Sequence, residues 1–161
     1  MIGEGANCLC RSSLAADKDM DIALKLFKFL GTTFIFDESW MNTVTAVSGS
    51  GPGYVYDFLE REKLDYRHIP EEKIRSFSID FKEAAELAGL NKKDASKLVD
   101  VTIRGSLATL SATDAIPATL RDKVASKGGT TEAGLNVLHD GGSLAEAIKR
   151  AVERAKELSK E

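Results

Sequence analysis

The feature that most constrains the fold is a succession of amphipathic helical patterns, which runs from residue 38 almost to the end of the chain. In each segment, apolar side chains recur every three or four residues, the spacing that places them on one face of an α-helix. Glycine, proline or asparagine separates most segments from the next. The pattern predicts a packed set of helices over residues 38–47, 54–62, 71–88, 92–110, 118–125, 130–139 and 143–158.

The first 37 residues have a different pattern. Residues 4–11 and 32–37 are short apolar or β-branched runs, which predict strands. Residues 17–30 predict an amphipathic helix, with acidic side chains near its start and lysines near its end. Its apolar stripe is formed by Ile22, Leu26, Phe29 and Leu30. The sequence therefore predicts a mainly α chain that opens with a β-α-β unit.

Composition argues against several functions. The chain has 161 residues, of which 43% are hydrophobic and 29% charged, as in an ordinary globular protein. Its net charge of −3 provides no basic patch for nucleic acid, and no apolar run approaches the roughly 20 residues that span a membrane. The first residues lack a signal-peptide pattern, so a cytoplasmic location is expected. Cys8 and Cys10 are interpreted as buried thiols of the first strand, and no metal site is expected because zinc would need about four ligands.

One short segment has the features of an anion site: residues 126–131, Ser-Lys-Gly-Gly-Thr-Thr. They stand where the helix 130–139 is predicted to begin. Backbone N–H groups, the positive end of the helix dipole and two hydroxyl groups would therefore converge on one small carboxylate. Glycine also lets a ligand approach the backbone closely, because it has no Cβ. The alternative is a plain loop with a threonine that caps the helix.

A second glycine cluster, Ser48–Tyr54, interrupts the helical pattern. Its small residues suit a close approach between helices, which we favour over contact with a ligand, and Gly105 is likewise expected at a helix crossing. Read together with Asp122–Thr131 and Ala133–Leu138, in this order and at this separation, the cluster resembles the C-terminal part of pyrroline-5-carboxylate reductase. That family performs the last step of proline synthesis. The resemblance extends from Gly3 to about Leu158.

The resemblance implies a Rossmann-type domain that holds NADPH or NADH, followed by a helical domain that forms a homodimer or a higher oligomer. Residues 1–37 would be the last part of the nucleotide-binding domain, and residues 38–161 the helical dimerisation and substrate-anchor domain. No Gly-x-Gly-x-x-Gly motif occurs in the sequence, so this chain itself is expected to bind no dinucleotide. We interpret the chain as a truncated, split or excised reductase that is inactive alone.

The resemblance also assigns site residues. It places the carboxylate of a small substrate at the start of the helix 130–139, and a catalytic hydroxyl that bonds the ring nitrogen at Thr131. The residues implied in substrate binding are Ser126, Gly128, Gly129, Thr130 and Thr131.

Two departures from the family pattern affect this assignment. Lys127 stands where the family usually has proline, and the connection over residues 61–76 is longer than usual. Two other functions remain open. One is a non-catalytic helical dimerisation module that has lost its cofactor half. The other is the helical domain of a different dehydrogenase.

Overall fold

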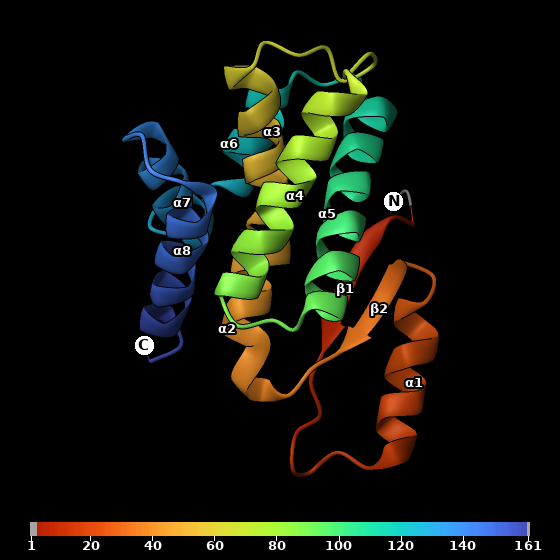
Figure 1. Ribbon diagram of the computed structural model, residues 1–161. Helices are drawn as coiled ribbons and strands as arrows, with labels where there is room; N and C mark the ends of the chain where they lie inside the picture. The colour runs from red at the N-terminus through yellow and green to blue at the C-terminus, as the bar shows by residue number, and fades with distance from the viewer. Residues whose placement is uncertain (1–2, 161) are drawn as a thin grey trace.

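The N-terminal part of the chain is a β-α-β unit. The computed structural model describes residues 3–160 (Figure 1). In the unit, β1 and β2 are parallel neighbours, with Gly5 opposite Gly31 and Leu9 opposite Ile35. The bounds are Gly5–Leu9 for β1, Asp17–Phe27 for α1 and Gly31–Ile35 for β2. The predicted unit is confirmed, although each element is shorter than the sequence pattern indicated.

The apolar stripe predicted for residues 17–30 is largely exposed. Ile22, Leu26 and Phe29 are 47%, 63% and 81% exposed, respectively. The half-buried side chains of the helix instead include Ala23 and Phe27. The helix has apolar side chains around much of its circumference, but the unit offers only two strands to cover it. The apolar surface beyond these strands therefore remains exposed.

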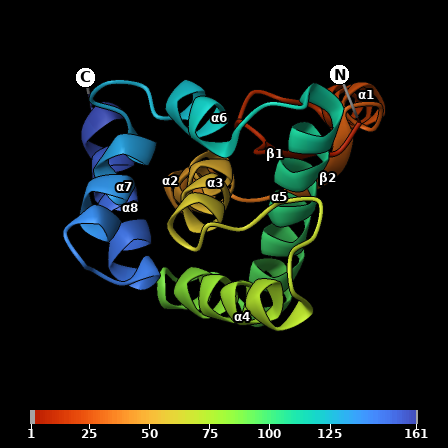
Figure 2. The same ribbon diagram turned by 90° about the horizontal axis from the view of Figure 1, so that it is seen from above.

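The rest of the chain is a helical assembly around α3 (Figures 1 and 2). A 3₁₀ turn (Glu38–Trp40), α2 (Met41–Val44) and a π-helical turn (Thr45–Gly49) lead into α3 (Gly51–Arg61). They are followed by α4 (Glu71–Leu87), α5 (Lys92–Thr113), α6 (Pro117–Val124), α7 (Thr130–His139) and α8 (Leu144–Leu158). The predicted mainly helical architecture is confirmed. Within residues 3–160, no helix is both long enough and apolar enough to cross a membrane.

The second glycine cluster widens a helix rather than ending it. The Ser50 N–H donates to the Thr45 carbonyl, five residues earlier, at 2.9 Å. Such a π-helical turn accommodates one extra residue within a helical path. Pro52 follows in the first turn of α3, where its missing N–H is tolerated. The predicted break is therefore a local change of pitch within a continuous rod.

α3 is almost wholly buried and holds the core together. Its Phe58 ring stacks on Phe77 of α4 with ring centroids 4.4 Å apart, and Tyr54 meets Phe81 edge-on at 6.2 Å. A Cβ added to Gly51 would lie 2.5 Å from the Thr102 methyl of α5. The close packing expected of the glycine cluster is thus confirmed.

Gly105 has a different partner from the one expected. A Cβ at this position in α5 would lie 2.5 Å from the backbone carbonyl oxygen of Glu4, so the close contact is with the segment leading into β1 and not with another helix. The neighbouring Arg104 Nε donates to the Glu4 carboxylate at 2.8 Å. Together these two contacts attach the start of the β-α-β unit to α5.

The connection between α3 and α4 is attached to the end of α5. It comprises residues 62–70, because α4 already begins at Glu71. The Tyr66 hydroxyl donates to Asp114 Oδ1 at 3.0 Å, and Arg67 pairs with the same carboxylate. The Arg67 guanidinium also lies over the Tyr66 ring, 4.6 Å from its centroid. The long connection is therefore a packed element of the surface.

We expect Gly105→Ala to loosen the contact between the β-α-β unit and α5 without unfolding the helical assembly. The new Cβ would meet the Glu4 carbonyl, an overpacking of about 1–3 kcal/mol, while the gain in helix propensity offsets only about 1 kcal/mol. Amide hydrogen exchange should therefore become faster in β1 and β2 but not in α7 and α8.

Gly49→Ala is the matched control, since a Cβ there would lie 3.6 Å from the Thr45 methyl, an ordinary contact. If both variants left exchange in β1 and β2 at the wild-type rate, the proposed attachment through Gly105 would be wrong.

Candidate functional site

The predicted anion loop is a tight turn between α6 and α7. The Gly129 N–H donates to the Ser126 carbonyl at 2.9 Å, and Gly128 has a φ of +71°, in the left-handed region that favours glycine. Gly129 is the N-cap residue of α7, and a Cβ on it would lie 2.5 Å from Ser126 Oγ. The turn itself therefore requires both glycines, whether or not a ligand binds.

Both backbone polar groups of Gly128 have partners within the chain. Its N–H donates to Glu132 Oε2 at 2.7 Å, and its carbonyl accepts from Arg154 Nε at 2.7 Å. Glu132 lies in the first turn of α7 and supplies a negative charge at the positive end of that helix. A ligand carboxylate would therefore have to displace Glu132 before it could use the Gly128 N–H.

The first turn of α7 offers other donors. The backbone N–H groups of residues 130–132 precede the first intrahelical donor, Ala133, whose N–H reaches the Gly129 carbonyl at 3.2 Å. Ser126 is exposed and Thr130 is half-buried, so the turn can be reached from solvent. N–H groups converging at the positive end of a helix are suited to one small anion.

A hollow of about 300 Å³ lies beside this turn, between α7 and α8. Its lining includes Arg150 and Arg154. Both guanidinium groups bond to Glu157, at 3.0 and 2.9 Å, which offsets much of their positive charge. The attraction for an anion therefore comes mainly from the turn itself.

A buried hydroxyl at the start of α3 reaches the turn. Ser50 Oγ lies 3.0 Å from Thr130 Oγ1, and Ser50 is fully buried. The two residues are 80 positions apart in the sequence. Sequence reasoning missed Ser50 because its place in a glycine cluster indicated only close packing.

α3 and α7 approach each other through one glycine on each helix. A Cβ on Gly53 would lie 2.5 Å from Thr131 Cγ2, and one on Gly134 would lie 2.3 Å from the Tyr54 hydroxyl oxygen. Thr131 is only 4% exposed. Because threonine carries its methyl and hydroxyl groups on the same Cβ, seating the methyl against Gly53 also fixes the direction of the hydroxyl.

The Tyr54 hydroxyl at this contact is buried and lacks a hydrogen-bond partner among residues 3–160. Ser50 is a polar neighbour but does not meet hydrogen-bond geometry. Burial raises the pKa of this hydroxyl well above its ordinary value, so the group stays neutral and keeps its proton. Unpaired buried hydroxyls are uncommon, and nothing in the sequence pattern distinguished this one.

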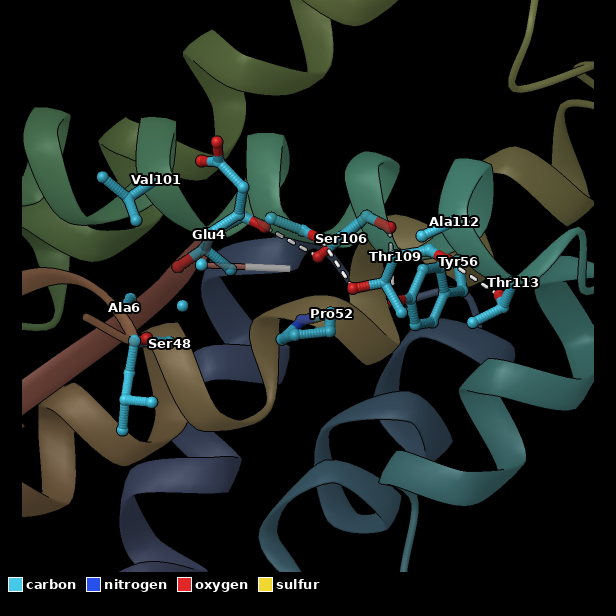
Figure 3. Close-up of a pocket in the computed structure, with 15 residues that line it drawn as sticks. Glu4, Ala6, Ser48, Pro52, Tyr56, Val101, Ser106, Thr109, Ala112 and Thr113 are labelled. Atoms are coloured by element: carbon cyan, nitrogen blue, oxygen red, sulfur yellow. Dashed lines mark hydrogen bonds between the residues drawn. The ribbon is translucent and has the colours of Figure 1, made fainter. Parts of the chain in front are cut away.

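A larger cavity, of about 450 Å³, lies between the N-terminal segment, α3 and α5 (Figure 3). The Tyr56 hydroxyl in its wall donates to the Ser106 carbonyl at 3.4 Å. The hydroxyls of Ser106 and Thr109 donate to carbonyls four residues earlier in α5. Its polar groups are thus largely satisfied within the protein, and residues 126–131 do not line it.

The two cysteines are only partly buried, and only one lies in a strand. Cys8 is in β1, where burial raises the pKa of its thiol to about 11. Cys10 lies beyond β1 and donates to the Glu38 carboxylate at 2.9 Å. Among residues 3–160, no three His, Cys, Asp or Glu side chains gather in an arrangement that could hold a metal ion.

Comparison with protein families gives one match at the helical part of the chain. A family model described as pyrroline-5-carboxylate reductase dimerisation matches residues 76–161, which include the turn before α7. A crystal structure of Plasmodium falciparum pyrroline carboxylate reductase with NADP bound is 26% identical. That match has a TM-score of 0.43 and covers 97% of this chain and 55% of that one.

Curated proteins are similar over nearly the whole chain. The pyrroline-5-carboxylate reductase of Methanosarcina acetivorans is 31% identical, over 99% of this chain and 53% of its own length. The Arabidopsis thaliana enzyme is 32% identical, over 98% of this chain and 51% of its own length. Pyrroline-5-carboxylate reductase 2 of Bacillus subtilis is 32% identical, over 93% of this chain and 47% of its own length. The chain therefore spans about half the length of the curated relatives it matches.

We expect Gly53→Ala to lower the free energy of unfolding by about 1–3 kcal/mol, because the new Cβ would collide with the Thr131 methyl. Thr131→Ser removes that methyl, so the double variant should recover most of the loss. Urea unfolding of the wild type, both single variants and the double variant measures the coupling. Strictly additive losses would show that this contact does not set the distance between α3 and α7.

Proposed function

The chain belongs to the pyrroline-5-carboxylate reductase family, and we propose that it is the helical half of such an enzyme, which anchors the substrate by its carboxylate. The family's reaction reduces the ring C=N bond of 1-pyrroline-5-carboxylate to give L-proline, with NADPH or NADH as reductant. The part proposed for this chain is to bind and orient the ring. We further propose that the chain does not turn over substrate alone.

The observation that carries this proposal is the N-terminal turn of α7. The N–H groups of residues 130–132 stand at the positive end of the helix, beside the exposed Ser126. Each charge-assisted hydrogen bond to a carboxylate is worth roughly 1.5–3 kcal/mol, and the helix dipole adds about 0.3–1 kcal/mol. The Gly129 N–H already donates to the Ser126 carbonyl. The role proposed for Gly129 is therefore to let the ligand approach the backbone closely.

Thr131 is the residue proposed to contact the reacting end of the substrate. Its methyl faces Gly53, so its hydroxyl is held in one direction by packing rather than by the ligand. A hydroxyl held in this way would hydrogen-bond the ring nitrogen once the carboxylate is anchored at the neighbouring backbone N–H groups. Orientation of this kind lowers a reaction barrier because it is established before the chemical step.

Two charges beside the turn act in opposite directions. Lys127 is exposed within the turn and would attract a carboxylate. Glu132 already bonds the Gly128 N–H and would repel one. For Gly128 to take the role that the resemblance implies, the Glu132 side chain must swing away. Binding at this position is therefore an exchange of one carboxylate for another.

The residues described do not fit a dinucleotide. The sequence has no Gly-x-Gly-x-x-Gly motif, and the connection from β1 to α1, residues 10–16, contains no glycine. The pyrophosphate of a dinucleotide lies at the glycine-rich first βα turn of a Rossmann-type domain, whereas the resemblance places β1 and α1 in the last part of that domain. We propose that a nucleotide-binding half, on a longer polypeptide or a separate one, carries the cofactor. The exposed apolar face of α1 and the open two-stranded parallel sheet support this, since parallel sheets are normally covered on both faces.

We also propose that the helical part forms a homodimer. The matching family model is described as a dimerisation domain, and apolar side chains are exposed on α4, with Ile79 54% and Leu87 72% exposed. Leu87 lines a hollow of about 440 Å³ between α4 and α8, together with Val152. A second copy would cover these groups.

A non-catalytic dimerisation module is the second candidate, and one observation favours it. Glu132 occupies the Gly128 N–H with the chain's own carboxylate, as would be expected of a turn that no longer needs to receive a ligand. The two candidates differ in one measurable property, which is whether the turn binds a small carboxylate.

If the turn is the carboxylate anchor, L-proline should bind it with millimolar affinity, because no cofactor face closes the site. An NMR titration should shift the amides of residues 130–132. Thr131→Val keeps the shape of the side chain but loses the hydroxyl, and should weaken binding about 3–10-fold. Glu132→Gln removes the competing charge and should tighten it.

Prolinamide, which has the ring but no carboxylate, is the ligand control and should leave these amides unshifted. Proline-induced shifts elsewhere in the chain, or equal affinity in all three proteins, would rule out the turn and favour the non-catalytic module.

A further inference from the structure

α3 and α7 run side by side in the same direction, and polar contacts join them at both ends. Ser50, just before α3, meets Thr130 at the start of α7. Asp57, near the end of α3, meets His139, the last residue of α7. The two glycine contacts described above lie between these ends. The contact between the helices therefore has a defined register along its whole length.

Asp57 is the buried charge of this contact. Its side chain is 1% exposed, although its neighbours in α3, Tyr56 and Phe58, are aromatic. Arg61 Nε donates to Asp57 Oδ2 at 2.7 Å, and His139 Nε2 donates to Asp57 Oδ1 at 2.8 Å. Arg121 Nη1 lies 3.8 Å from the same Oδ1. A buried carboxylate needs such partners, because burial without them is strongly unfavourable.

The partners of Asp57 come from both sides of the anion-binding turn. Arg121 belongs to α6, the helix that enters the turn, and His139 belongs to α7, the helix that leaves it. Arg121 is itself fixed by ion pairs with Glu60 and Asp122. One carboxylate on α3 therefore holds both helices that flank residues 125–129.

We propose that Asp57 is a positioning residue for the turn between α6 and α7, acting through His139 and Arg121; its consequence for ligand binding rests on the proposed function above. Residues 130 and 139 are about 14 Å apart along the axis of α7. Without the Asp57 contact, α7 is held to α3 only through its N-terminal half, up to the contact of Gly134 with Tyr54, and its C-terminal half can tilt away. Tilting moves Thr131 away from Gly53, and the direction of its hydroxyl is then no longer fixed.

The chemical nature of the contact also points to positioning. Replacing a buried ion pair by apolar groups is often neutral or stabilising, so stability alone is a weak reason for a charge at this place. Charge-assisted hydrogen bonds have a defined geometry, whereas contacts between methyl groups do not. The Asp57 carboxylate therefore restricts the relative positions of α3, α6 and α7 more than apolar contacts would. The arrangement is therefore best explained by the geometry that it imposes on the turn.

The test uses Asp57→Asn, His139→Ala and His139→Gln in the full chain, well below their melting temperatures. Asp57→Asn and His139→Ala should shift the amide resonances of residues 130–132 without ligand, and weaken proline binding about tenfold. His139→Gln retains an N–H donor close to the position of Nε2 and should restore affinity to within about twofold of the wild type. His139 is 48% exposed, so its replacement should not prevent folding.

Two controls separate positioning from stability. Val99→Ala removes buried apolar atoms from α5, away from the contact, and should lower the melting temperature without shifting residues 130–132. His68→Ala removes the other histidine, which is 84% exposed and 3.5 Å from Asp65, and should change neither property.

If Asp57→Asn lowers only the melting temperature, as Val99→Ala does, the positioning role is overturned. If the wild type binds no proline while Asp57→Asn still shifts the unliganded amides, the anchor function fails and the positioning of the turn stands.

Discussion

The close approach of α3 to its neighbours is the contact on which the other helices depend. Gly51 leaves room for the Thr102 methyl of α5, and Gly53 leaves room for the Thr131 methyl of α7. Protein interiors are packed to the density of organic crystals, so one added methyl group at either position would push a neighbouring helix outward. The position of the candidate site therefore follows from the absence of side-chain atoms at two positions on α3.

Local parts of this architecture could be predicted from the sequence, because their causes lie close together along the chain. The helices follow from their apolar spacing, and Ser143 with Glu146 forms the capping box that its sequence pattern indicates. The turn at 126–131 was recognisable because glycine and threonine adjoin a helix start. The contacts that hold this turn join residues 80 and 82 positions apart, Ser50 to Thr130 and Asp57 to His139. No periodic pattern identifies such pairs before the helices are placed.

The exposure of the apolar stripe of α1 has a related cause. Amphipathic spacing shows which side chains share a face, but it does not show which element covers that face. Leu26 and Phe29 are apolar and belong to one stripe, yet the two strands described here leave them exposed. A sheet of only two strands is also too small to be independently stable. Both features agree with a chain that spans about half the length of its relatives.

As the proposed carboxylate anchor, the turn before α7 would balance its own stability against binding. Glu132 satisfies the Gly128 N–H and places a negative charge at the helix N-terminus, an arrangement that stabilises the helix without a ligand. A ligand carboxylate placed there would break one charge-assisted hydrogen bond for each one it makes with Gly128. Net affinity must then come from the donors that Glu132 does not use, those of residues 130–132, and from the hydroxyl direction fixed by packing on Gly53. In the proposed carboxylate anchor, specificity is therefore a property of the helix packing more than of the glycine loop that first indicates it.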